Sequence, residues 1–166
     1  GAVGDDGGRR WSIDGGSLRN GMPREAFAII TIPGDNVEAL WGLVSDYQEM
    51  YRSEYKGIEH NINFTAEMTD MPATLIPEEI QDDLINAIEG CQNGVISMLV
   101  DFPGTVESST NLAIVKSSNE MIEIQILVRS SSESRKEAVC SSLESIFSLA
   151  GAKVEYSDGY GGWQPN

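Results

Sequence analysis

Few side chains in this chain of 166 residues are suited to catalysis on their own. There are two cysteines, Cys91 and Cys140, and a single histidine, His60. A nucleophilic cysteine usually needs a histidine beside it, but His60 stands in the polar segment IEHNIN, which is typical of a protein surface. A zinc site needs clustered His, Cys, Asp or Glu ligands, and the spacings HxD, HExxH and CxxC are absent. The motifs therefore do not indicate a self-contained enzyme.

Two polar side chains remain as candidates for a binding site. Asn20 lies in the stretch GGSLRNGMPREAFAII, between a two-glycine turn and a run that is typical of a strand. Arg129 ends another run, MIEIQILVR, whose alternation places it on the face opposite the isoleucines. An asparagine in a turn usually satisfies local backbone groups, and an arginine at a strand end is usually solvated. The local patterns alone therefore favour a structural role for both residues.

The composition restricts the partners and the compartment. The net charge is −15 and the pI is near 4.2, which argues against nucleic acid and an anionic membrane surface because both require clustered Lys and Arg. No apolar run reaches the roughly 18 residues that a membrane span needs, and no secretion signal is recognisable at the start. Two cysteines without a disulfide framework fit a reducing compartment. We therefore expect a cytoplasmic protein.

Hydrophobic patterns predict two strands and a long helix in the first part of the chain. Residues 9–13 and 26–32 are expected to be strands, and both faces of 26–32 are apolar, which favours cover by another domain or subunit. A capping box, Asp35 with Glu38, predicts the start of an amphipathic helix of about five turns. An alternating strand follows at 61–67. The apolar stripe of the helix is expected to be core, and it consists of Val37, Leu40, Trp41, Val44, Tyr47, Tyr51 and Tyr55.

The middle of the chain predicts one helix and one irregular region. Pro77 suits the first position of a helix, and Gly90 suits its end. No regular pattern is recognisable at 91–110. The apolar face of the helix consists of Ile80, Leu84, Ile85 and Ile88.

The last part predicts a strand pair, a helix and a final strand. Strands at 111–116 and 121–129 are joined by a turn at 117–120. The capping box SRKE starts a helix that ends at Gly151, and AKVEYSD at 152–158 is expected to be the last strand. The apolar face of this helix consists of Ala138, Val139, Leu143, Ile146 and Phe147.

Both halves of the chain follow the order strand, strand, helix, strand, with little residue identity. This order predicts an internal ββαβ duplication and an α+β fold, a ferredoxin-like two-layer sandwich with a mostly antiparallel sheet and helices on one face. We expect a flexible start at 1–8 and a single domain at 9–166. Within that domain, 9–67 and 111–157 form the two halves, and 68–110 forms a helical insertion and loop.

Several motifs, in order along the chain, resemble those of bacterial aminoacyl-histidine dipeptidases, the carnosinase-like branch of the di-zinc aminopeptidase and carboxypeptidase superfamily. GGSLRNGMPREAFAI is similar to the family signature GG-x-LRN-A-IPREAFA. Four further segments are similar to segments of that family, namely CQNGVISML, GTVESSTNLAIV, EIQILVRSS and SLESIFSLAGAKVEYSDGYGGWQPN. The resemblance extends from about Arg9 to Asn166.

The resemblance implies that the chain is most of the family's lid, or dimerisation, domain, and none of the catalytic domain that binds two zinc ions. The chain itself is then expected to bind no metal and to be inactive alone, and 158–166 returns toward the missing catalytic domain. The family's lid contributes an asparagine and an arginine to substrate binding, and these match Asn20 and Arg129. The implied partners are the catalytic domain of the same protein and a dipeptide, and a homodimer through the lid stays open.

A second interpretation is a ferredoxin-like module for ligand binding or oligomerisation, unrelated to peptidases. The repeated ββαβ order supports it, because this scaffold hosts many functions. The parent reading frame discriminates between the two interpretations. Zinc-ligand motifs on both flanks would favour the lid, and a different neighbouring domain would favour the module.

Overall fold

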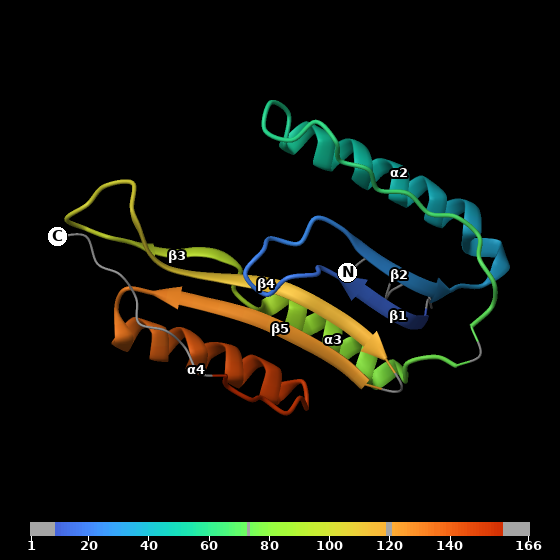
Figure 1. Ribbon diagram of the computed structural model, residues 1–166. Coiled ribbons are helices and arrows are strands. Elements are labelled where there is room, and N and C mark those ends of the chain that lie inside the picture. Colours follow the sequence, from blue (N-terminus) through green and yellow to red (C-terminus); the bar gives the residue numbers. More distant parts are fainter. Residues whose placement is uncertain (1–8, 73, 119–120, 158–166) are drawn as a thin grey trace.

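The computed structural model describes residues 9–72, 74–118 and 121–157, which form a curled sheet and three α-helices (Figure 1). The elements are β1 (Arg9–Gly15), β2 (Ala26–Thr31), the short 3-10 helix η1 (Gly34–Asn36), α2 (Val37–Glu54), α3 (Glu78–Gly90), β3 (Gly94–Met98), β4 (Val106–Ser118), β5 (Met121–Ser130) and α4 (Glu133–Leu149). The expected flexible start at 1–8 and return segment at 158–166 lie outside the described residues. Part of the expected turn at 117–120 does so as well.

β4 is the central strand of a five-stranded antiparallel sheet. One of its edges pairs with β5 along nearly its whole length. Its other edge pairs first with β3 and, further along, with the β1–β2 hairpin through Gly15 and Val115. A register shift between Leu112 and Ile114 lies near the point where the partner of this edge changes. The predicted, mostly antiparallel sheet is confirmed.

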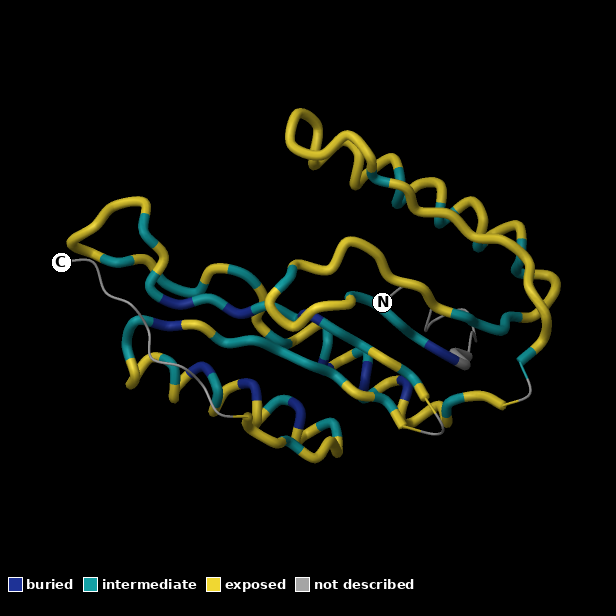
Figure 2. Tube along the Cα trace, viewed as in Figure 1, coloured by how far each residue is buried: buried dark blue, intermediate teal, exposed yellow. Residues whose placement is uncertain are grey.

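α3 and α4 cover one face of the sheet, and the core lies between them and β4 (Figures 1 and 2). In α4, Val139, Leu143 and Phe147 recur every four residues, share one face of the helix and are all buried. The buried apolar residues are Leu84, Ala87, Ala113, Val139, Leu143 and Phe147. The predicted two-layer α+β sandwich is confirmed. None of the helices in the described part of the chain is long and apolar enough to cross a membrane.

Both helices that follow a predicted capping box begin at a different cap. Asp35 lies inside η1, and Asn36 holds the N-cap position of α2. At α4 the cap is Ser132, whose Oγ accepts a hydrogen bond from the Arg135 N–H at 3.3 Å, and Ser134 lies inside the helix. The Asn36 backbone is helical, whereas Ser132 has the extended backbone that a capping side chain usually needs. In a run of serines, the position with that backbone is set by the end of the preceding strand.

The buried face of α3 is displaced from the predicted one. Leu84 and Ala87 are buried as core residues, but Ile80 is 50% exposed. Gln81 takes the inner position and is only 4% exposed. Its Nε2 donates a hydrogen bond to the carbonyl of Ile76, just before the helix, so the buried amide is satisfied.

α2 forms the predicted five-turn helix but stands apart from the layer of α3 and α4 (Figure 1). None of its residues is buried, and Trp41 remains 46% exposed. The expectation that its stripe is core is therefore wrong. Tyr51 packs instead against Phe64 of the following segment, with ring centroids 6.3 Å apart. Periodicity shows which face of a helix is covered, but it does not show what covers that face.

The predicted strand at 61–67 is not formed. This segment returns along α2, and side chains of the helix bind its backbone. Gln48 Oε1 accepts a hydrogen bond from the Phe64 N–H at 2.9 Å, and Arg52 Nε donates one to the Ile62 carbonyl at 2.7 Å. The residues alternate because one side of the segment packs on α2. Side chains of α2 satisfy its backbone groups, so no sheet ladder is needed.

The irregular region predicted at 91–110 contains β3 and the first residues of β4, which begins at Val106 rather than at 111. The start of β4 is hidden in the sequence because its inward side chains are polar. Thr110 is buried, and its Oγ1 donates to the Gln92 carbonyl at 2.9 Å. A buried hydroxyl is tolerated when it forms a hydrogen bond. A search for hydrophobic periodicity does not detect a strand whose inward side chains are polar.

The final strand predicted at 152–158 is also absent over 152–157, the part that the structure describes. This segment lies against α4, where the Tyr156 hydroxyl bonds to Glu144. The order strand, strand, helix therefore recurs in the two halves. The third strand predicted for each half is missing from the described residues.

Candidate functional site

Arg129 lies at the end of β5 on the open face of the sheet, the face not covered by α3 and α4. It is exposed, and it pairs with Ser109 of β4. Next to this pair, Ser108 and Ser130 are buried, and their hydroxyls share a hydrogen bond of 2.8 Å. Because side chains alternate along a strand, Arg129 projects away from the helices. No carboxylate in the described part of the chain forms an ion pair with its guanidinium.

Asn20 lies exposed in the loop that joins β1 to β2, residues 16–25. Gly16, at the base of this loop, has a φ of 75°. A Cβ at Gly16 would stand 1.8 Å from the carbonyl oxygen of Ala113 in β4. Only glycine allows both this backbone conformation and this approach, so the loop begins in direct contact with the central strand.

Asn111 of β4 ties the same loop to the open face of the sheet. Its Nδ2 donates a hydrogen bond of 2.8 Å to the carbonyl of Gly21, which is 90 residues away in sequence. Asn111 lies two residues from Ser109, the partner of Arg129, and therefore on the same face. The structure thus brings the loop that carries Asn20 and the strand that carries Arg129 together around Asn111.

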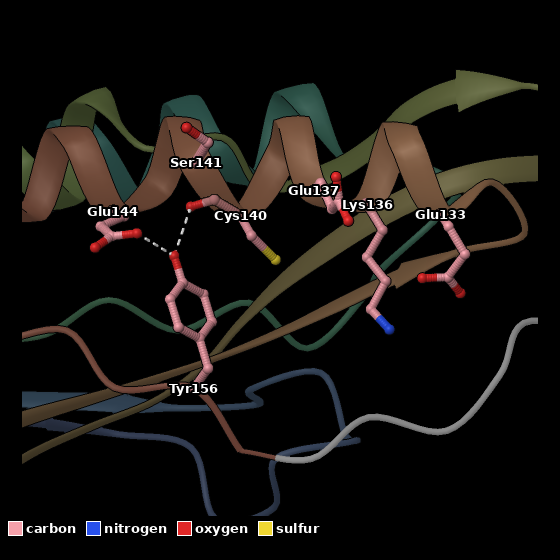
Figure 3. A pocket seen from close by; sticks show the side chains of 7 residues that line it. All are labelled: Glu133, Lys136, Glu137, Cys140, Ser141, Glu144 and Tyr156. Atoms are coloured by element: carbon pink, nitrogen blue, oxygen red, sulfur yellow. Dashed lines mark hydrogen bonds between the residues drawn. The ribbon is translucent and has the colours of Figure 1, made fainter.

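A second side-chain contact ties the same loop to the segment after α4. Arg19 Nη1 donates a hydrogen bond of 3.0 Å to Ser157 Oγ in the segment after α4. The neighbouring Tyr156 hydroxyl lies 2.5 Å from Glu144 Oε2 and 3.4 Å from the Cys140 carbonyl oxygen (Figure 3). The loop is therefore linked to the last residues of the described chain.

An open groove of about 350 Å³ lies beside Tyr156 along α4 (Figure 3). The hydrogen bond to Glu144 raises the pKa of Tyr156 to about 12, with smaller contributions from burial and from the charge of Glu144. Burial raises the pKa of the Cys140 thiol in the same groove. A thiol with a raised pKa is a poor nucleophile at neutral pH, so the groove holds no activated cysteine. It is lined by Glu133, Lys136, Glu137, Cys140, Ser141, Glu144 and Tyr156.

The remaining candidates from the sequence do not form a catalytic centre. His60 is exposed. Cys91 is a free, half-buried thiol, and burial raises its pKa. Among the described residues, no group of three or more His, Cys, Asp or Glu side chains could hold a metal ion.

Two asparagines of the site region were not singled out from the sequence. Asn111 holds the loop, and Asn93 Oδ1 accepts a hydrogen bond of 2.8 Å from the N–H of the adjacent Leu112. Both lie in segments that resemble family motifs, NGV and STNLAIV. Their partners are distant in sequence or set by the strand order, so no local pattern shows their contacts.

Comparison with known proteins places this geometry in a larger context. The sequence is 37% identical over 154 residues to a cytosol non-specific dipeptidase of Escherichia coli, a match that covers 93% of this chain and 32% of that protein. The fold superposes on the crystal structure of an aminoacylhistidine dipeptidase from Vibrio alginolyticus with a TM-score of 0.96 and 33% identity. That match covers 100% of this chain and 34% of the other. No protein-family model matches the sequence.

The chain thus spans about a third of the length of both dipeptidases that it matches. Nearly the whole chain matches one part of each larger protein, as expected if the chain corresponds to a single domain of such a protein. The sequence identity and the shared fold fit a lid domain of the aminoacyl-histidine dipeptidase family.

Proposed function

We propose that this chain is the lid domain of a cytoplasmic, zinc-dependent Xaa-His dipeptidase, and that it helps to bind the dipeptide and to close the active site. The observation that carries the proposal is the match of nearly the whole chain, in sequence and in fold, to a third of two dipeptidases. In this proposal the zinc pair belongs to the catalytic domain of the parent enzyme, and the chain alone is inactive.

Arg129 binds the carboxylate at the end of the dipeptide in this proposal. Its guanidinium is exposed at a strand end, and no carboxylate in the described part of the chain neutralises it. A guanidinium can donate two parallel hydrogen bonds to a carboxylate, which fixes the orientation of the ligand as well as holding it.

Asn20 donates its side-chain amide to the carbonyl oxygen of the scissile peptide bond. A fixed amide donor stabilises negative charge as it develops on that oxygen. When bound in the catalytic domain, zinc supplies polarisation of the same carbonyl and activation of water. Closure of the lid excludes bulk water and aligns the dipeptide with those groups.

The catalytic domain of the same protein is the first partner in this proposal, and a second copy of the chain is the other. Large apolar side chains remain exposed on the edge strand β2 and on α2, with Phe27 at 65% and Trp41 at 46%. Exposed apolar surface of this kind favours contact with another protein surface, which supports a homodimer through the lid.

The test compares this chain with the full-length parent enzyme. We expect the parent to hydrolyse an Xaa-His dipeptide and this chain to show no turnover. In the parent, Asn20→Ala should lower kcat/KM about 100-fold, as expected for loss of one oxyanion donor. Arg129→Ala should lower it by a similar factor, about 100-fold, mainly through a higher KM.

Matched exposed residues provide the controls. Arg24→Ala removes an exposed arginine in the same loop, and Asn61→Ala removes an exposed asparagine beside α2. Both should leave kcat/KM within about twofold of the parent. Turnover by the isolated chain, or unchanged kinetics in Asn20→Ala and Arg129→Ala, would refute the proposal.

A further inference from the structure

The loop that carries Asn20 depends on contacts outside itself for its position. Among the described backbone groups at the tip of the loop, one turn hydrogen bond forms, from the Gly21 N–H to the Leu18 carbonyl at 3.1 Å. Two side-chain hydrogen bonds join it to the rest of the described chain, one from Arg19 to Ser157 and one from Asn111 to the Gly21 carbonyl. Both involve a neighbour of Asn20, but the first is made by the end of a long side chain and the second binds the loop backbone itself.

The pairing of β4 with β5 fixes the backbone position of Asn111, opposite Leu127. It stands in the central strand, just before the register shift between β4 and β5, and near the point where the other edge of β4 changes its partner from β3 to β1. The β1–β2 loop contacts β4 at this level, through Gly16 beside the Ala113 carbonyl and through the Gly21 carbonyl at Asn111. The Asn111 side chain is half-buried, and its hydrogen bond to the Gly21 carbonyl fixes the position of the loop over the sheet.

The geometry points to Asn111 as a positioning residue that sets Asn20 in register with Arg129, an inference that rests on the proposed function. The Asn111 side chain shares a sheet face with Arg129, and its amide holds the carbonyl of the residue after Asn20. A displacement of about 1 Å in a substrate-positioning group can cost up to about 100-fold in rate. Asn111 therefore acts on the reaction through Asn20 without touching the dipeptide.

Kinetics of the full-length parent enzyme test this coupling. Asn111→Ala removes the donor, and Asn111→Asp replaces it by an isosteric acceptor that faces the Gly21 carbonyl. We expect both to lower kcat/KM for an Xaa-His dipeptide about tenfold. In an Asn20→Ala background the same changes should cost less than about twofold, and in an Arg129→Ala background they should again cost about tenfold.

A matched variant separates positioning from a loss of stability. Asn93→Ala removes a side-chain hydrogen bond to the neighbouring residue of β4 but does not touch the loop. It should lower the thermal midpoint about as much as Asn111→Ala, with kcat/KM within about twofold of the parent. An effect of Asn111→Ala that is equally large with and without Asn20 would overturn the inference.

Limited trypsin digestion gives a readout that does not depend on activity. The Arg19–Asn20 bond lies in the loop, and we expect Asn111→Ala to speed its cleavage in the full-length parent at least about threefold, with no change in Asn93→Ala. Faster cleavage in a parent that hydrolyses no dipeptide would overturn the proposed function and support the anchoring of the loop. Unchanged cleavage and unchanged kinetics in Asn111→Ala, with turnover that depends on Asn20, would overturn the inference alone.

Discussion

Arg129 and Ser130 are adjacent in sequence, yet the sheet gives them opposite environments. Ser130 is 8% exposed and bonded to Ser108 beneath the helices, whereas Arg129 is exposed on the open face. The alternation of MIEIQILVR was enough to predict this placement, because strand geometry is local. The contact between Asn111 and Gly21 could not be predicted in the same way, since it joins residues 90 positions apart.

The hydrogen bond from Tyr156 to Glu144 predicts an unusual titration. An ordinary tyrosine has a pKa of 10.0, and the bond to the Glu144 carboxylate raises that of Tyr156 to about 12. The folded state thus favours the protonated phenol. The stabilisation is fully present below pH 10 and is lost as the pH rises toward 12. Ultraviolet titration of tyrosinate should show one tyrosine, absent in Tyr156→Phe, that ionises near pH 12.

Glu144→Gln provides the control for this titration. The substitution removes the carboxylate but keeps an oxygen that can accept from the hydroxyl. We expect the pKa of Tyr156 to fall toward the ordinary value of 10.0 in this variant. A pKa that stays near 12 would show that Glu144 is not the cause.

α2 and α4 have similar lengths and both carry apolar stripes, but they differ in what covers them. α4 buries Val139, Leu143 and Phe147 against the sheet, whereas α2 buries none of its residues. The sequence predicted both helices with nearly correct bounds because helical periodicity is local. It predicted the wrong cover for α2, because a segment such as 61–67 can satisfy the pattern of a strand while it packs on a helix.

We therefore expect a Phe→Ala substitution to reduce stability more in the core than beside α2. Phe147 is 6% exposed in the core and Phe64 is 41% exposed against α2. Phe147→Ala should lower the free energy of unfolding by about 3–5 kcal/mol, as for a buried phenylalanine. Phe64→Ala should lower it by less than about 1.5 kcal/mol, the value of a partly exposed aromatic contact.

Urea unfolding of this chain, followed by circular dichroism, measures both values. The slope of the unfolding free energy against urea should stay constant in Phe64→Ala if only a local contact is lost. Equal losses in the two variants would contradict the division between the core and the separate α2 element.

The proposed binding groups Asn20 and Arg129 are both exposed, and large apolar side chains on β2 and α2 are exposed as well. Both arrangements fit a domain that works against other protein surfaces, and the chain matches a third of two dipeptidases.

The proposed homodimer predicts a dependence of oligomeric state on this apolar surface. We expect the full-length parent to sediment as a dimer, and Phe27→Asp with Trp41→Asp should raise the dissociation constant at least about tenfold. A charge placed in a desolvated contact loses its hydration without gaining a partner. Analytical ultracentrifugation over a range of concentrations measures the change.

Leu149→Asp serves as the control for the sedimentation experiment. Leu149 is 86% exposed at the end of α4, away from β2 and α2 (Figure 1). This variant should keep the sedimentation coefficient of the parent. A parent that is monomeric at all concentrations, or a dimer unaffected by the double substitution, would contradict the proposed contact.

The sequence alone was sufficient for the α+β class, the three helices, the hairpin strands and the exposed placement of Arg129, because each depends on periodicity over neighbouring residues. It was also sufficient for the resemblance to dipeptidases, which depends on the order of motifs. Only the folded structure showed four other features. They are the cover of α2, the polar start of β4, the missing third strands and the hydrogen bond from Asn111 to the loop. Each of these is a contact between distant segments, and hydrogen bonds between such segments leave no local pattern.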